Sequence, residues 1–238
     1  HRDLHSFPTR RSSDLVGTGN GAPWNRKIRS PSGGDNLYLA SLVALNADTG
    51  KYIWHYQETP GDNWDYTSTQ PMILADLTIE GAPRKVILHA PKNGFFFVVD
   101  RTNGKFISAK NFVDVNWATG YDANGRPIEV PAARGDAPYD AVPGPYGAHN
   151  WHPMSFNPQT GLAYANTLAF GGKYKSEPAT FKQGEWYVGM DLTDPWEWGT
   201  GPRGHLKAID PMTGKAKWEA PSDIPRFSGV LSTAGGVV

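Results

Sequence analysis

A turn motif that recurs along the chain constrains its fold more than any other feature. Each copy begins with Asn or Asp and closes with Gly four residues later, and the copies occupy residues 46–50, 100–104, 157–161 and 210–214. The motif therefore returns every 53 to 57 residues. An apolar stretch precedes each copy, and Trp54 and Trp218 each stand four residues after a closing glycine. A hairpin repeated about every fifty residues is typical of β-propeller blades, so we expect four successive blades.

The composition agrees with an all-β fold. The chain has 238 residues, with 27 Gly, 20 Pro and 12% aromatic residues, which indicates many turns and packed rings. Lys and Arg together number 23, as do Asp and Glu, so no net field favours nucleic acid, and we expect neither a nucleic-acid partner nor a membrane span. Because Cys is absent, this chain can form no disulfide, thiolate metal site or Cys-x-x-Cys-His haem attachment.

Changes in composition along the chain predict its organisation. Residues 1–14 are polar and follow neither structural period, so we interpret them as a foreign or disordered segment. Residues 15–238 are predicted to form a partial β-propeller domain. Two segments rich in turn-forming residues, 114–147 and 171–204, are predicted to be surface excursions.

The strongest candidate for chemistry is Asp65, which stands between Trp64 and Tyr66. Two large rings limit the access of water to a carboxylate, and this favours a perturbed pKa and work as a base or a metal ligand. The alternative is that Asp65 caps a turn while Trp64 fills a core.

Further candidates lie in three short motifs: Gly17-Thr18-Gly19-Asn20, Lys92-Asn93-Gly94 and His149-Asn150-Trp151-His152-Pro153. The glycines before Asn20 allow close approach of the backbone to another group. This motif is not a phosphate loop, because Gly-Lys-Ser/Thr is missing. Taken singly, Asn20 could be a turn residue, Lys92 a solvated hairpin residue, and Asn150 with Trp151 packing residues.

Together, in this order and spacing, these motifs resemble those of the quinoprotein alcohol dehydrogenases of the methanol/ethanol type. The resemblance implies an eight-bladed β-propeller that binds pyrroloquinoline quinone (PQQ) and a metal ion. It also implies a small primary alcohol as substrate, a cytochrome c electron acceptor and a periplasmic location. We expect the chain to be an internal part of such a ring, inactive by itself, with further ligands supplied by segments before Asn20.

The resemblance also implies roles for particular residues. Asn20 and Asp65 correspond to metal ligands, and Asp65 also to the catalytic base. Lys92 corresponds to the cation at the reactive edge of the quinone, and Asn150 and Trp151 to further quinone contacts. Amide and carboxylate oxygens are hard ligands that suit Ca²⁺.

The residue at position 67 bears on the choice of metal. In the lanthanide-using branch an additional Asp stands two residues after the catalytic carboxylate, and here that position is Thr67. We therefore expect Ca²⁺. Two other functions stay open: a non-catalytic β-propeller that serves as a binding scaffold, and a quinoprotein dehydrogenase that acts on sugars or aldehydes.

Overall fold

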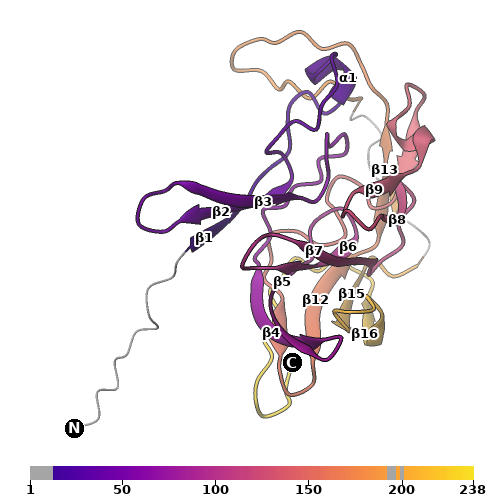
Figure 1. Ribbon diagram of the computed structural model, residues 1–238. Helices are drawn as coiled ribbons and strands as arrows, with labels where there is room; N and C mark the ends of the chain where they lie inside the picture. Colours follow the sequence, from indigo (N-terminus) through magenta and orange to yellow (C-terminus); the bar gives the residue numbers. More distant parts are fainter. Residues whose placement is uncertain (1–12, 192–196, 199–200) are drawn as a thin grey trace.

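The computed structural model describes residues 13–191, 197–198 and 201–238, and the regular secondary structure of these residues is almost entirely β-strand (Figure 1). Most of the predicted foreign segment lies outside the described residues. The first strand begins at Ser13, two residues before the predicted start of the propeller domain. Ser13 and Asp14 pair with Asn46 and Leu45 of the next strand.

Three antiparallel sheets form the body of the chain. The first contains β1 (Ser13–Gly17), β2 (Ser41–Asn46) and β3 (Tyr52–Gln57). The second contains β4 (Ile73–Ile79), β5 (Ala82–His89), β6 (Phe95–Asp100) and β7 (Phe106–Asn111). The third contains β11 (Ser155–Asn157), β12 (Leu162–Leu168), β15 (Gly204–Ile209) and β16 (Ala216–Ser222).

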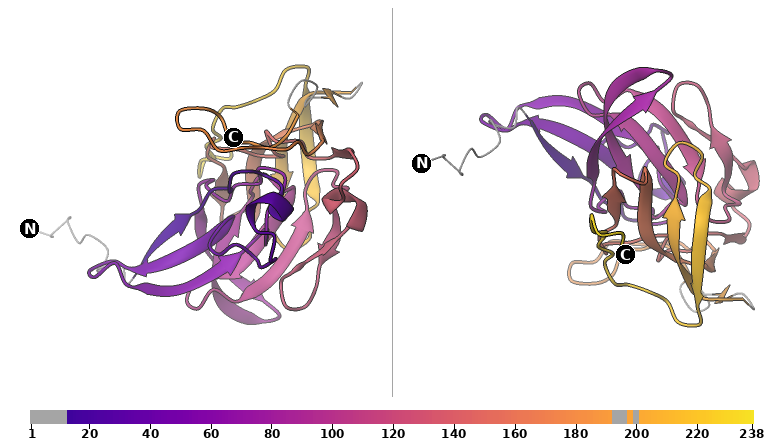
Figure 2. Two further views of the ribbon diagram at one scale, coloured as in Figure 1. Left: turned by 90° about the horizontal axis from the view of Figure 1, so that it is seen from above. Right: turned by 90° about the horizontal axis from the view of Figure 1, so that it is seen from below.

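Smaller elements lie between these sheets. They are α1 (Arg26–Arg29), the 3₁₀ helix η1 (Pro131–Arg134), the pair β8 (Ala118–Tyr121) and β9 (Pro127–Glu129), and a sheet of β10 (Tyr139–Ala141), β13 (Phe170–Tyr174) and β14 (Glu197–Trp198). Viewed along two further directions, the three main sheets follow one another as an open arc (Figure 2). This arrangement is that of a partial β-propeller, as the sequence predicted.

The repeated motif forms the same turn each time. Gly50, Gly104, Gly161 and Gly214 all have a left-handed backbone, with φ of 67°, 71°, 69° and 70°. The backbone N–H of each glycine donates to the carbonyl oxygen of the first residue of its motif. Glycine adopts this conformation without the steric penalty that other residues meet.

The expectation that each turn marks a separate blade is wrong for one copy. Residues 46–50, 100–104 and 210–214 join the last two strands of the first, second and third sheets, whereas residues 157–161 join the first two strands of the third sheet. The third and fourth copies therefore share one sheet. The chain between β12 and β15 leaves this sheet to form β13 and β14, and this excursion sets the spacing between the two turns.

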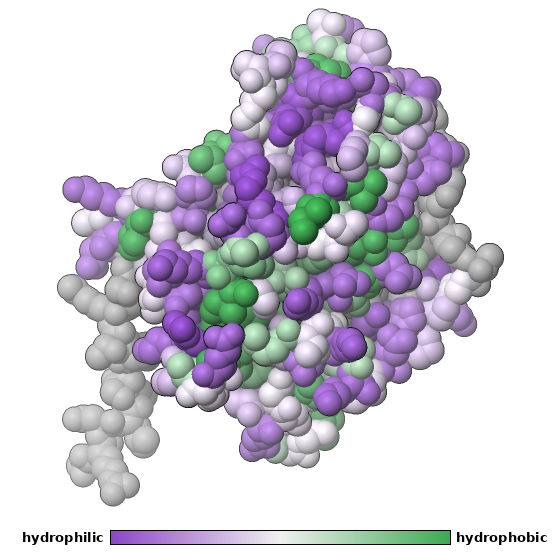
Figure 3. Space-filling model, turned by 45° about the vertical axis from the view of Figure 1, so that its right-hand side comes forward, coloured by the Kyte–Doolittle hydropathy of each residue, from purple (hydrophilic) through white to green (hydrophobic). Residues whose placement is uncertain are grey.

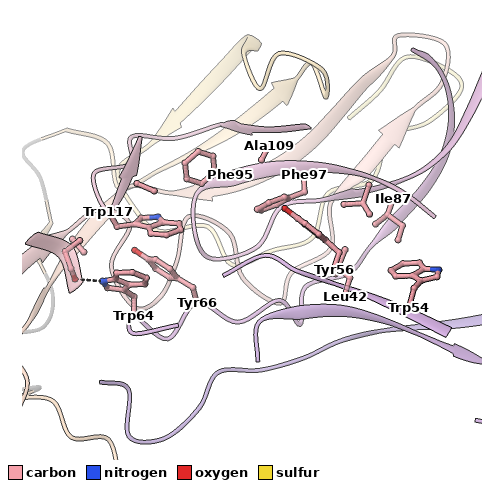
Figure 4. Close-up of a cluster of buried hydrophobic side chains, with 14 of the residues drawn as sticks. Leu42, Trp54, Tyr56, Trp64, Tyr66, Ile87, Phe95, Phe97, Ala109 and Trp117 are labelled. Atoms are coloured by element: carbon pink, nitrogen blue, oxygen red, sulfur yellow. Dashed lines mark hydrogen bonds between the residues drawn. The ribbon is translucent and has the colours of Figure 1, made fainter. Parts of the chain in front are cut away.

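The second sheet has a separate core on each of its two faces. Phe95, Phe97 and Val99 of β6 pack with Leu42 and Tyr56 of the first sheet (Figure 4). The alternate residues of the same strand, Phe96 and Val98, pack instead with Ala163, Ala165 and Ile209 of the third sheet. Because successive side chains of a strand point to opposite faces, one strand joins both cores.

The turns take part in this packing. A Cβ atom at Gly104 would lie 2.5 Å from a ring atom of Trp54, so the tryptophan of the first sheet packs directly against the turn of the second. Trp54 is 8% exposed. The glycine thus serves both the turn conformation and the contact between sheets.

Residues 114–147 were predicted to be a surface excursion, but part of this segment is core. Trp117 is fully buried and Ala133 and Ala141 belong to the same hydrophobic cluster. On the face shown in Figure 3, hydrophilic side chains predominate in the upper part and apolar ones gather across the middle. Among the described residues, no helix has the length and apolarity needed to cross a membrane.

Candidate active site

Asp65 lies in residues 58–70, here called the Asp65 loop, which form most of the connection between β3 and β4. Its two aromatic neighbours are fully buried, and their rings stack with centroids 5.6 Å apart (Figure 4). Trp64 donates its indole N–H to the carbonyl oxygen of Ala133 at 3.2 Å, and the Tyr66 hydroxyl donates to that of Pro143. Both rings are therefore fixed, and the side chain of Asp65 is 21% exposed.

The residue that caps this turn is Asp62, not Asp65. One oxygen of the buried Asp62 carboxylate accepts from the backbone N–H groups of Trp64 and Tyr66, each at 3.1 Å. Burial is the main cause that raises the pKa of Asp62. Asp65 itself has a left-handed backbone with φ of 63°, a conformation that non-glycine residues hold only when their surroundings enforce it.

Asp65 forms an ion pair with Lys92. Lys92 Nζ donates to Asp65 Oδ2 at 2.9 Å, and the lysine side chain is 9% exposed. The pKa of Asp65 is raised to about 6, and burial is the largest cause. The charge and hydrogen bond of Lys92 act in the opposite direction, and the charge of Asp62 adds to the rise. The predicted perturbation of the pKa is therefore present, and its largest cause is the loss of water around the carboxylate.

Lys92 lies in the turn between β5 and β6, and its backbone is in close contact with residues 147 and 148. The carbonyl oxygen of Lys92 accepts from the N–H of Ala148 at 2.9 Å. A Cβ atom at Gly147 would lie only 2.4 Å from Lys92 Cβ, so this position requires glycine. The segment that contains Asn150 thus packs directly against Lys92.

His89 connects both ends of the Asp65 loop to β5. Its Nδ1 lies 2.8 Å from Glu58 Oε1, and its Nε2 lies 3.1 Å from the carbonyl oxygen of Gln70. A carbonyl oxygen can only accept, so Nε2 is the donor in the contact with Gln70. Both side chains are fully buried. The loop that carries Asp65 is therefore fixed to the strand that leads to Lys92.

Asn20 follows a segment that lies beside the Asp65 loop. The N–H of Ser68 donates to the carbonyl oxygen of Thr18 at 3.0 Å, and a Cβ atom at Gly17 would lie 1.9 Å from the carbonyl oxygen of Ser68. The predicted close approach is thus confirmed at Gly17 but is wrong at Gly19, where a Cβ atom would meet nothing within 4 Å. Asn20, two residues beyond the contact, is partly buried, and its role as a metal ligand stays a prediction.

Asn150 and Trp151 differ in their surroundings. The Asn150 amide donates to the carbonyl oxygen of Tyr146 at 2.8 Å and accepts from the N–H of Trp151 at 2.9 Å. Trp151 is 61% exposed and stacks on Phe227, with centroids 5.2 Å apart. Asn150 thus shapes the local backbone, whereas Trp151 presents a ring at the surface. Their predicted contacts with a quinone stay predictions.

Two polar residues near the site escaped the sequence analysis. Asp62 stands two residues before Trp64, whose N–H it accepts from. An Asp in this position relative to a bonded N–H is a recognisable turn signal in a sequence. Arg134 comes from the segment predicted to be a surface excursion, and no local pattern links it to the Asp65 loop. No group of three or more His, Asp or Glu side chains that could hold a metal occurs within the described residues.

Comparison with known proteins identifies relatives of this chain. Residues 18–116 match the family described as "Glucose/ethanol/alcohol dehydrogenase, beta-propeller domain" of PQQ proteins. The quinohemoprotein alcohol dehydrogenase of Comamonas testosteroni is 59% identical over 99% of this chain, and its crystal structure superposes with a TM-score of 0.88. The 1-butanol dehydrogenase (cytochrome c) of Thauera butanivorans is 54% identical over 91% of this chain.

A europium-containing methanol dehydrogenase also superposes, with a TM-score of 0.88 and 36% identity over 94% of this chain, which covers 40% of that protein. The chain spans 35% of the Comamonas protein and 33% of the Thauera protein. The resemblance of this chain to the PQQ-dependent quinoprotein alcohol dehydrogenases is therefore confirmed, over a stretch of about a third of their length.

Proposed function

We propose that this chain supplies the catalytic base of an alcohol dehydrogenase that uses PQQ and Ca²⁺ and oxidises a primary alcohol to an aldehyde. The observation that carries the proposal is the ion pair between Asp65 and Lys92, in which burial raises the pKa of Asp65 to about 6. A base whose pKa lies near the working pH is both ionised and able to take a proton. The relatives named above support the same reaction class.

Asp65 removes the proton of the substrate hydroxyl. The carboxylate offers about four lone-pair directions, and the bond to Lys92 occupies one of them. Without a bound cation, burial raises the pKa of Asp65 and so favours uptake of a proton by this carboxylate. When bound, PQQ is the oxidant that accepts the hydride, which no side chain can do.

Lys92 would hold the quinone edge, and Asp65 with Asn20 would hold the metal. An ammonium that is 9% exposed and pairs with one carboxylate fits a contact with a partly negative carbonyl oxygen. A carboxylate and an amide are hard oxygen donors, but Ca²⁺ takes six to eight ligands. The two residues therefore fit part of a calcium shell, and other donors must complete it. Asn150 and Trp151 are proposed as further quinone contacts.

Ca²⁺ is proposed over a lanthanide because of Thr67. The Thr67 hydroxyl accepts from the Gln70 amide at 3.3 Å and adds no negative charge beside Asp65. A trivalent ion requires more anionic ligands than a divalent ion. With metal-stripped enzyme that contains this chain, Ca²⁺ should restore activity and La³⁺ should not, and Thr67→Asp should shift the preference toward La³⁺. Restoration by La³⁺ alone in the unsubstituted enzyme would refute the choice of metal.

The substitution Asp65→Asn tests the base. In enzyme that contains this chain, loaded with PQQ and Ca²⁺, kcat should fall by roughly 10²- to 10⁴-fold. Asp76→Asn is the matched control, because Asp76 also pairs with a cation, Arg101, but its side chain is 72% exposed. Activity retained by Asp65→Asn would assign the base to another residue.

The substrate and the electron acceptor are also proposals. We propose a small primary alcohol as substrate, a cytochrome c as acceptor and the periplasm as location. Because the matched domain's description also names glucose, rates with 1-butanol and glucose should be compared directly. A higher kcat/KM for glucose would place the enzyme among the sugar dehydrogenases. A chain that is incorporated in the complete enzyme yet supports no quinone binding would favour the non-catalytic scaffold.

A further inference from the structure

Arg134, at the end of η1, makes three contacts with the segment that leads to Asp65. Its guanidinium donates to the carbonyl oxygens of Pro60 and Gly61 and to the side-chain oxygen of Asn63. The two contacts with Pro60 and Asn63 each measure 3.2 Å. One side chain, more than seventy residues away in sequence, thus holds three of the five residues before Asp65.

The rest of the guanidinium is also occupied. Glu129 accepts from it with both carboxylate oxygens, each at 2.6 Å, and the guanidinium carbon lies 4.7 Å from the centroid of the Trp64 ring. The five N–H donors of Arg134 are therefore all used. Because Glu129 balances the charge, Arg134 supplies the Asp65 loop chiefly with directed hydrogen bonds.

The carbonyl groups of this segment bond to side chains rather than to a neighbouring strand. Arg134 binds those of Pro60 and Gly61, and Arg29 binds that of Asp62 at 2.8 Å. The left-handed backbone of Asp65 follows three residues later. A conformation of this kind persists only where the surrounding structure fixes it.

We propose that Arg134 is a positioning residue, whose planar guanidinium fixes residues 60–63 so that Asp65 stays in its buried place against Lys92. The catalytic importance of this role rests on the proposed function. The contacts of Arg134 with residues 60–63 do not depend on it. Because Glu129 balances the charge of Arg134, a looser Asp65 loop after substitution of Arg134 would report the loss of its directed hydrogen bonds.

The test measures amide hydrogen exchange in the full chain. In Arg134→Gln the backbone N–H groups of Trp64, Tyr66 and Thr67, which bond to Asp62 and Asp65, should exchange roughly tenfold faster or more, while those of β5 and β6 keep their rates. Arg134→Lys should behave alike, because an ammonium has three donors and no planar fork. Arg101→Gln is the control, since the described side-chain bond of Arg101 goes to Asp76, and it should leave the exchange of the three loop N–H groups unchanged.

A folded Arg134→Gln chain in which the three loop N–H groups exchange at unchanged rates, or no faster than those of β5 and β6, overturns the proposal. Full recovery in Arg134→Lys overturns it too, since charge alone would then suffice. If Arg134→Gln does not fold, Glu129→Gln serves instead, because it keeps the guanidinium but weakens its orientation. Faster exchange of the loop N–H groups in Glu129→Gln supports the proposal, and unchanged exchange refutes it. The proposed function is tested separately by the activity of Asp65→Asn, so the two ideas can fail independently.

Discussion

The pH dependence of folding gives the sharpest test of the Asp65 environment. The pKa of Asp65 is about 6 in the folded chain, against 3.8 for an ordinary Asp. The folded chain therefore binds this proton more tightly than the unfolded chain, and ionisation of Asp65 lowers the free energy of unfolding as pH rises from about 3.8 to about 6. A difference of about two pKa units at 1.36 kcal/mol each amounts to ~3 kcal/mol.

Substitution by Asn isolates this effect, because Asn does not titrate. Urea unfolding of the full chain and of Asp65→Asn should be measured between pH 3.5 and 7.5. Other titrating groups contribute alike to both proteins, so the stability of the unsubstituted chain minus that of the variant should fall by ~3 kcal/mol across this range. The lost bond to Lys92 shifts the whole difference by a constant and does not alter its slope. A difference that is flat, or that rises with pH, would refute the reasoning.

Three further predictions concern the same region. Lys92→Met should raise the pKa of Asp65 above about 6, because the charge and hydrogen bond of Lys92 lower this pKa. Carboxyl ¹³C NMR measures the pKa, and a fall would contradict the prediction. Gly147→Ala should destabilise the chain by about 1–3 kcal/mol more than Gly33→Ala in urea unfolding, since both glycines are left-handed but only Gly147 meets an atom within 4 Å; equal losses would contradict this. Burial lowers the pKa of His149 to about 3, so the chain loses stability as pH falls from about 6.5. His149→Gln does not titrate and should remove up to ~3 kcal/mol of that loss by pH 4. An equal loss of stability with falling pH in the variant and the unsubstituted chain would count against this prediction.

Much of the fold follows from local chemistry that the sequence displays. The repeated turn is visible in the sequence as Asn or Asp with Gly four residues later. All four copies form this turn, with the glycine in the left-handed conformation. The turn does not say which two strands of a sheet it joins. The copy at residues 157–161 therefore led to a wrong repeat count, because the excursion that forms β13 and β14 gave it an ordinary spacing from the next copy.

The candidate site divides in the same way. The raised pKa of Asp65 was predictable because the two large aromatic residues beside it in the sequence indicated a buried segment. The contact with Lys92, 27 residues away, was accessible only through resemblance to a family. Arg134 could not have been predicted, since its bonds to residues 60–63 depend on how distant segments pack, and a lone Arg in a turn-rich segment carries no local signal.

The strand β6 has a consequence for how this sheet finds its pairing. Its first five residues, Phe-Phe-Phe-Val-Val, are buried on both faces, so a shift by one residue would exchange one apolar set for another. The free energy of hydrophobic burial normally opposes such a slip, but here it differs little between the two registers. Selection of the register falls to the ends of the strand: at one end the Asn93 side chain accepts from the N–H of Phe95 and donates to Thr59, and at the other the turn of residues 100–104 closes against Trp54. In this sheet the contacts at the two ends of the strand select an alignment that the apolar interior only stabilises.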